Sequence, residues 1–261
     1  MCRPKHDHLD VLRLGFSINV RPVLRSAEET DAIGDFARLI ARLDGRFRYE
    51  AERVAEGINE RRSTAVADWR THFDDLLRHG HSGSYSAGLR LGGEDPDDRR
   101  DDVSDVGKAL RDLESYYTAG FENDLVDGHT PLLDPETGLV NPDRVHARMR
   151  MYAGRMRGTA NAGFADGSSP DSDVWWRLGP KAEVHCPDCP VLADASPWRP
   201  DTLGTTPGGN DTACLFHCNC DLEIEGITGF QAFGLGPASE VAPIGRPKTE
   251  TSQEEPVLLP A

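Results

Sequence analysis

The most informative segment is HCPDCPVLADASPWRPDTLGTTPGGNDTACLFHCNC, residues 185–220, which holds five of the six cysteines of the chain. They are arranged as Cys186-x2-Cys189, then twenty-four residues, then Cys214-x3-Cys218-x-Cys220. Two short thiol clusters separated by a loop of this length can fold back so that both supply ligands to one tetrahedral ion. The spacing therefore predicts a zinc site. Disulfide bonds and unrelated buried thiols are the alternatives that the same spacing allows.

The predicted ligands come from both thiol clusters. Cys218 and Cys220 lie two residues apart and would share one face of a strand, so we expect only one of them to join Cys214. The predicted set is Cys186, Cys189, Cys214 and Cys220, with Cys218 as the alternate fourth ligand. His217 is a weaker candidate, and His185 is weaker still. Four protein ligands leave no place for a reactive water, so the expected cofactor is a structural Zn²⁺.

The composition describes an acidic chain. Its 261 residues carry a formal net charge of −15, and 38% of them are apolar. No apolar run approaches the roughly 20 residues that span a bilayer, and no signal-peptide pattern is present, so we expect a soluble protein without a membrane partner. The negative charge argues against a chain that coats DNA. Nine carboxylates and three cations fall within 173–228, so the cysteine region is also a poor DNA ligand.

The pattern of residues along the chain predicts a mainly α fold with a small, zinc-stapled C-terminal module that contains loops and β-structure. The predicted segments are a basic N-terminal arm at 1–25, a helical body at 26–165, a cysteine-rich module at 173–228 and a mobile tail at 235–261. Within the body, the Gly, Ser and charged residues of 79–102 predict a flexible acidic loop. His79 and His81 are expected at the surface of that loop.

Apolar residues recur at helical spacing in three parts of the body. The first part, from Ile33 to Leu76, predicts either one very long helix or an antiparallel pair broken near Gly45 or Gly57. A second helix is expected from about residue 104, with apolar residues on one face, and it should end by Gly128. The face residues are Val106, Leu110, Leu113, Tyr117 and Phe121. A third helix should begin at Asn141-Pro142, because an Asn cap followed by proline favours a helix start.

Five arginines border the apolar stripe of this third helix. At about 100° per residue, one border holds Arg144, Arg148 and Arg155, and the other holds Arg150 and Arg157. Long arginine stems can cover the rim of a groove while their heads reach a partner. We therefore take these five residues as candidates for partner binding. Pairing with the many aspartates of the same chain is the alternative.

The motifs of several common enzyme classes are missing. The sequence contains no G-x-S-x-G elbow, no Gly-rich phosphate loop ending in Lys-Ser or Lys-Thr, and no H-E-x-x-H pair. Gly208-Gly209 lies in an expected loop and by itself indicates a turn. We therefore expect no enzymatic activity and no small-molecule substrate.

Three strings together resemble a known family. They are Arg150-Met151-Tyr152-Ala153-Gly154-Arg155-Met156-Arg157-Gly158-Thr159-Ala160-Asn161, Trp176-Arg177-Leu178-Gly179-Pro180 and His185-Cys186-Pro187-Asp188-Cys189. With the closing Cys218-Asn219-Cys220, they resemble the phage head morphogenesis proteins, the minor head proteins similar to protein F of phage Mu. The resemblance covers about residues 140–225. The family usually carries a His shortly before its C-x-C; here Leu215 takes that place, and the adjacent Cys214 is the replacement that the resemblance implies.

The resemblance implies a low-copy component of a virion. Its partners would be the viral portal protein and the major capsid protein, with packaged DNA a further partner of the basic arm. The protein would lie in the capsid near the portal vertex, and in the host cytoplasm during assembly, where it would assist head assembly and DNA packaging or ejection. Two rival functions remain open from the sequence: a zinc-containing DNA-binding regulator and a zinc hydrolase.

Overall fold

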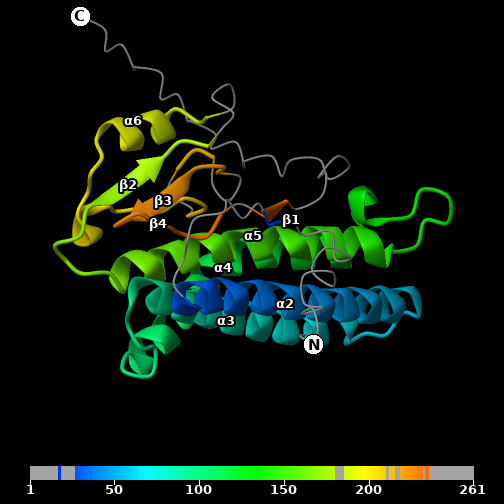
Figure 1. Ribbon diagram of the computed structural model, residues 1–261. Helices are drawn as coiled ribbons and strands as arrows, with labels where there is room; N and C mark the ends of the chain where they lie inside the picture. Colours follow the sequence, from blue (N-terminus) through cyan, green and yellow to red (C-terminus); the bar gives the residue numbers. More distant parts are fainter. Residues whose placement is uncertain are drawn as a thin grey trace, which may run out of the picture.

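The computed structural model describes residues 17–18, 27–179, 185–209, 212–214, 218–231 and 233–234. Within these residues, long helices run side by side and a small sheet lies against α5 (Figure 1). The helices of the body are α2 (Ala27–Asn59), α3 (Ala65–Gly92), α4 (Arg100–Val126) and α5 (Pro142–Asp166). The mainly α fold with a small β-containing C-terminal module is thus confirmed. No helix in the described part of the chain combines the length and apolarity that crossing a membrane requires.

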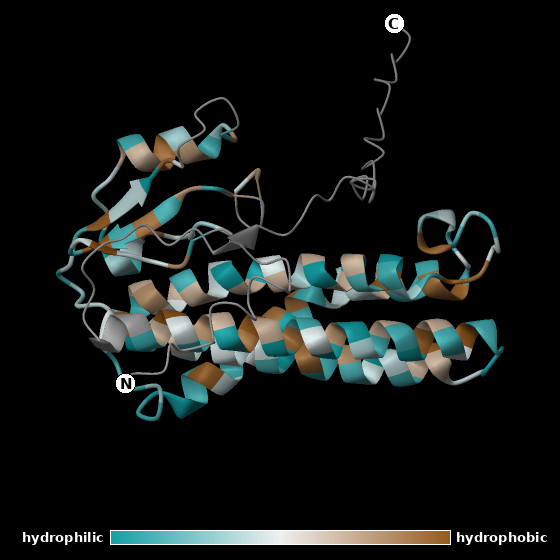
Figure 2. Cartoon of the chain, turned by 45° about the vertical axis from the view of Figure 1, so that its right-hand side comes forward, coloured by the Kyte–Doolittle hydropathy of each residue, from teal (hydrophilic) through white to brown (hydrophobic). Residues whose placement is uncertain are grey.

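The body is held together by apolar residues that repeat every three or four positions. The helices of the body carry both hydrophilic and hydrophobic residues along their length (Figure 2). Trp69 and Phe73 of α3 stack at 5.1 Å, and Phe121 of α4 and Tyr152 of α5 meet this pair edge-on. Such aromatic contacts add to the free energy gained by burying the rings. The four helices therefore share one core, with α3 packed against each of the others.

The first apolar pattern forms an antiparallel pair of helices, as one of the two predicted alternatives stated. α2 ends at Asn59, shortly after Gly57, and α3 begins at Ala65. A Cβ on Gly57 would lie 2.6 Å from the Cβ of Ala65, so only glycine lets the second helix start this close to the first. Arg61 completes the turn with a φ of 60°.

The flexible loop predicted for 79–102 is wrong, because α3 continues through Gly92 and α4 starts at Arg100. The glycines and serines that suggested a loop lie where helices approach closely. A Cβ on Gly88 would lie 2.6 Å from the backbone nitrogen of Phe164 and closer still to the Ala160 carbonyl oxygen. The small residues therefore serve helix packing against α5. Only 93–99 connects the two helices.

The C-terminal module consists of a three-stranded antiparallel sheet with short helices. Its strands are β2 (Val174–Arg177), β3 (Asp221–Ile224) and β4 (Ile227–Thr228), in the order β2-β3-β4. Trp176 pairs with Leu222 in the register, and both side chains are buried. The helical elements of the module are α6 (Asp188–Asp194) and the 3₁₀ turn η3 (Pro200–Thr202); another 3₁₀ turn, η1 (Thr130–Leu132), lies in the helical body before α5.

The two ends of the chain are described only at one short pairing. β1 (Ser17–Ile18) pairs antiparallel with β5 (Phe233–Gly234). The rest of the arm predicted for 1–25 and the whole tail predicted for 235–261 lie outside the described residues.

Candidate metal centre

Five cysteines converge in the C-terminal module. Cys186 and Cys189 flank the start of α6, where the Cys189 N–H donates to the Cys186 carbonyl oxygen at 3.3 Å. The segment that carries Cys214 is tied to the same turn, because the Ala213 N–H donates to Asp188 Oδ2 at 2.7 Å. Cys218 and Cys220 lead directly into β3. Local turns on one side and a strand on the other therefore bring distant thiols together.

The sulfur separations match those of ligands around one ion. Cys186 Sγ lies 3.3 Å from Cys189 Sγ and 3.2 Å from Cys214 Sγ, and Cys189 Sγ lies 3.6 Å from Cys214 Sγ. Four thiolates held tetrahedrally at about 2.3 Å from a zinc ion would lie about 3.8 Å apart. A disulfide would bring two sulfurs to about 2.05 Å, and the described cysteines are free. The cluster can hold a metal ion.

The fourth ligand is a choice between two sulfurs. Cys189 belongs to two groups of three thiols, one with Cys186 and Cys214 and the other with Cys218 and Cys220. Cys218 Sγ lies 3.7 Å from Cys189 Sγ. Both thiols expected at this position are therefore within reach, and the preference for Cys220 over Cys218 remains a prediction.

Of the two histidines proposed as weaker ligands, only His185 lies within the described residues. His185 Nδ1 lies 3.7 Å from the sulfur of Cys220, and its Nε2 lies 3.2 Å from the Gly179 carbonyl oxygen. His185 therefore lies beside the cluster, in contact with one of its sulfurs. His217 and Leu215 lie outside the described residues.

Mutual hydrogen bonding divides the thiols into readily and reluctantly ionised ones. The pKa of Cys220 is lowered to about 5, chiefly by a hydrogen bond from the Cys218 thiol and secondarily by one from the Gly179 N–H. The pKa of Cys218 is raised, chiefly by that same hydrogen bond to Cys220 and then by burial. Burial also raises the pKa of Cys189. Clustered thiols resist ionising together without a cation, and a metal ion supplies the charge that lets all of them ionise.

Arg157 fastens this cluster to the helical body. Its side chain is 1% exposed, and it donates to the carbonyl oxygens of Phe230 at 2.7 Å, Cys218 at 2.5 Å and Cys220. Asp221 lies 3.8 Å from the same guanidinium. The carbonyls on either side of Asn219 therefore point at one buried cation on α5. Its burial contradicts the partner-facing position predicted for Arg157.

The residues next to Arg157 complete the contact between α5 and the module. Asn161 donates to the Pro207 carbonyl oxygen at 3.0 Å and accepts from the Phe230 N–H at 2.9 Å. Thr206 Oγ1 donates to the Gly158 carbonyl oxygen at 2.9 Å. A Cβ on Gly158 would lie 2.5 Å from the carbonyl carbon of Gly208, so the loop can rest on the helix only at a glycine.

The other four arginines also have partners within the chain, as the alternative interpretation stated. Arg148 is buried against Asp124, which contradicts a partner-facing position. The remaining contacts are Arg150 with Asp44 at 3.2 Å, Arg155 with Glu114 at 3.4 Å, and Arg144 with the Pro131 carbonyl oxygen at 3.3 Å.

Sequence reasoning missed a buried polar cluster in the body. His81, expected at the surface, is 2% exposed; its Nδ1 lies 2.8 Å from Thr159 Oγ1. Its Nε2 lies 3.4 Å from Glu114, which is 1% exposed and also contacts Arg155. Nothing in the local sequence distinguishes this histidine from His79, because the pairing depends on two other helices.

The chain was compared with protein-family models, with curated proteins and with solved structures, and none of them matches it.

Proposed function

We propose that this chain is a minor head protein of a tailed virus, a non-catalytic virion component whose C-terminal module is stapled by one zinc ion. The observation that carries the zinc part of the proposal is the convergence of Cys186, Cys189 and Cys214 with Cys218 and Cys220. A site filled by protein sulfurs leaves no position for a reactive water, so it stabilises a fold and does not perform hydrolysis.

Zinc is the ion that best suits this donor set. Thiolates in a tetrahedral arrangement favour zinc or iron–sulfur centres, and magnesium and calcium prefer oxygen ligands. Structural zinc sites bind with about 10–16 kcal/mol, enough to order a small module whose sheet has only short strands. Arg157 would help by holding the carbonyls of Cys218 and Cys220 in place.

The head-protein function rests on the sequence resemblance, and the geometry supports it in one respect. The strings that carry the resemblance meet at one place in the fold. Arg157 and Asn161 bind the module, and Gly179 lies so close to Asn219 that a Cβ would collide with its carbonyl oxygen. The resembling residues therefore form one structural unit, the junction of α5 with the cysteine module. Such a rigid unit suits a protein that works through surfaces, bound to the portal and the inner capsid.

The test is copurification with the portal protein of the same virus, with metal quantified in the same sample. We expect the reduced chain to carry one equivalent of zinc and to retain the portal protein on an affinity column. A Cys189→Ser variant should lose both, and an Asp97→Ser variant, altered at an exposed connecting residue, should lose neither.

Two results would contradict the proposal. A zinc-loaded chain that ignores the portal protein but shifts a DNA fragment at physiological salt would instead favour a regulator. A metal-free chain that keeps its fold under strong chelation would remove the structural role of the ion.

A further inference from the structure

Helix α4 leaves several of its apolar residues outside the core. The sequence places Val106, Leu110, Leu113 and Tyr117 on one helical face. In the structure Leu113 is 58% exposed, Tyr117 is 43% exposed, and the adjacent Tyr116 is 67% exposed. We call Val106, Leu110, Leu113, Tyr116 and Tyr117 the α4 stripe; Val106 and Leu110 are half-buried. Phe121, which continues the same face, is buried.

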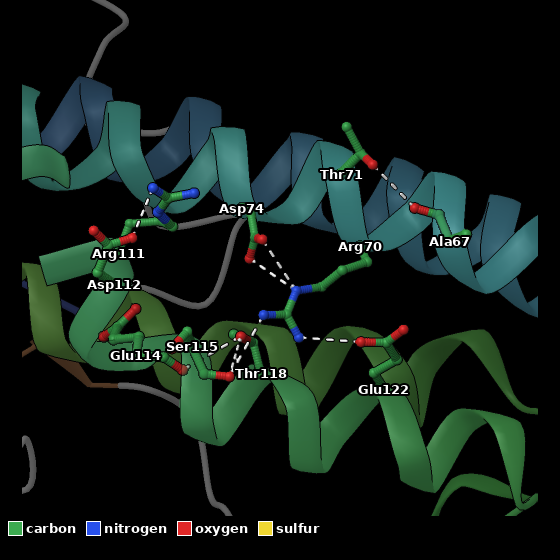
Figure 3. A network of polar contacts seen from close by, with 10 residues as sticks. All are labelled: Ala67, Arg70, Thr71, Asp74, Arg111, Asp112, Glu114, Ser115, Thr118 and Glu122. Carbon is green, nitrogen blue, oxygen red and sulfur yellow. Dashed lines mark hydrogen bonds and ion pairs between the residues drawn. The ribbon is translucent and has the colours of Figure 1, made fainter. Parts of the chain in front are cut away.

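The inward face of α4, which adjoins the α4 stripe, is polar over much of its length. Its buried residues are Gly107, Glu114, Thr118, Phe121 and Leu125. Glu114 is held by His81 at 3.4 Å and by Arg155 at 3.4 Å. In addition, Arg70 of α3 reaches Glu122 at 3.2 Å and the Ser115 carbonyl oxygen at 3.4 Å (Figure 3).

These polar contacts fix the rotation of α4 about its axis. Turning the helix to bury Leu113 would expose Glu114 and leave His81 and Arg155 without their carboxylate inside the body. Removing one partner of a buried charged network is strongly unfavourable. The α4 stripe is therefore held at the surface, where a helix that had only to complete this core would place polar residues.

A cavity of about 530 Å³ lies beside the α4 stripe. Its wall on one side is Val106, Leu110 and Leu113, and on the other side it is formed by Leu203 and Thr205 of the module. This volume lies within the range of about 300–1,000 Å³ that is typical of ligand sites. Thr205 Oγ1 is buried at the cavity and has no hydrogen-bond partner among the described residues. The cavity thus offers apolar walls and a hydroxyl that can donate or accept a hydrogen bond.

The charge around the cavity is negative. Asp166 and Asp201 line it and are exposed, and neither forms an ion pair within the described part of the chain, although Asp166 accepts from the Tyr85 hydroxyl at 2.7 Å. The cation that lines the cavity, Arg155, is already paired with Glu114. The exposed cation Lys108 on α4 is already paired with Asp105 at 3.1 Å. Arg111 likewise contacts Asp112 at 2.7 Å. An occupant with apolar residues flanked by Lys or Arg would therefore complement both the walls and the rim.

We propose that the α4 stripe and its cavity form the docking site for a basic amphipathic helix of another protein. Apolar side chains of that helix at i, i+3, i+4 and i+7 would cover the α4 stripe and enter the cavity, and its cations would face Asp166 and Asp201. The site is separate from the cysteine cluster. The assignment of the partner to the virus head rests on the proposed function. The docking chemistry is independent of that function.

The experiment measures binding of a fluorescent lysine-rich peptide with leucines at i, i+3, i+4 and i+7 to the full, zinc-loaded chain. A peptide of the same composition with the leucine order scrambled controls for general attraction to an acidic protein. We expect the patterned peptide to bind at least about tenfold more tightly than the scrambled one, a difference of about 1.4 kcal/mol. Leu113→Lys should abolish this difference. Leu139→Lys should preserve it, because Leu139 is similarly exposed, at 51%, but lies before α5.

Equal binding of the two peptides, or full binding by a Leu113→Lys variant with an unchanged unfolding midpoint, would overturn the proposal. If sedimentation shows that the chain is a dimer and that the Leu113→Lys variant is not, the occupant of the site is a second copy of this chain, and the proposal of another protein is overturned. If the Leu113→Lys variant still binds the portal protein and the unaltered chain does not bind the peptide, the head-protein function stands and this docking site is refuted. If the chain binds the peptide but not the portal protein, the docking site stands and the head-protein function is refuted.

Discussion

Replacement of Arg157 by methionine tests how the cysteine module is joined to the helical body. The arginine is 1% exposed, and it donates to the carbonyl oxygens of Cys218, Cys220 and Phe230. Methionine has a similar length and no polar group, so the substitution removes the hydrogen bonds with little loss of packing volume. The three carbonyls would then be buried without this donor.

The expected loss of stability in Arg157→Met follows from two opposing contributions to the free energy of unfolding. A hydrogen bond to a charged group contributes about 1.5–3 kcal/mol, but the desolvation of a buried guanidinium offsets much of three such bonds. Removing one partner of a buried charged network costs about 3–5 kcal/mol. We therefore expect Arg157→Met to lower the free energy of unfolding by about 3–5 kcal/mol. For an ordered region of this size, that corresponds to a fall in Tm of roughly 10 °C.

The assay is thermal unfolding of the zinc-loaded chain, followed by circular dichroism, together with the rate at which a chromogenic chelator extracts the metal. Extraction should be faster in Arg157→Met, because two of the three freed carbonyls belong to cysteines of the cluster. Arg48→Met is the matched control: its ion pair with Asp143 is exposed, at 3.3 Å, and should be worth at most about 1 kcal/mol. Equal Tm values for the two variants would refute the anchoring role.

Three further expectations follow from the same structure. Chelation of the metal should unfold the C-terminal module while α2–α5 keep their helical signal, which hydrogen exchange would resolve; uniform protection after chelation would contradict this. Cobalt substitution in Cys218→Ser and Cys220→Ser should lose one sulfur charge-transfer contribution in only one of the two variants, and that variant identifies the fourth ligand. Gly88→Ala should destabilise the chain by about 3 kcal/mol, because its Cβ would meet the backbone of α5. Gly120→Ala, which meets nothing within 4 Å, should be neutral or stabilising by up to about 1 kcal/mol in urea unfolding.

Features encoded by short-range patterns were predictable from the sequence. The apolar residues of α2 recur every three or four positions, and Asn141 caps α5 by accepting from the Asp143 N–H at 2.9 Å. The two thiol clusters follow the same logic, since the turn at Cys186–Cys189 is local. The helical body follows from such patterns, and so does each of the two thiol clusters, because each depends on residues close together in the chain.

The glycines of α3 show where local patterns fail. Gly88 and Gly92 have low helix propensity, and the sequence around them predicted a loop. Their lack of a side chain is what lets α3 touch α5, and that packing outweighs the intrinsic cost of glycine in a helix. The benefit depends on a second helix far away in the chain, so no window of the sequence could reveal it.

The order of residues is enough to show which segments are amphipathic, which side chains can bind a metal and which bear charge. Which surfaces meet becomes visible only in the folded chain: Arg157 turns into the module, His81 is buried beside Glu114, and the α4 stripe is left outside. The physical reason is that a periodic pattern marks the faces of a helix without saying which face a distant partner will cover. When a buried ion pair and an apolar stripe compete for the interior, the geometry of the neighbouring helices settles the rotation.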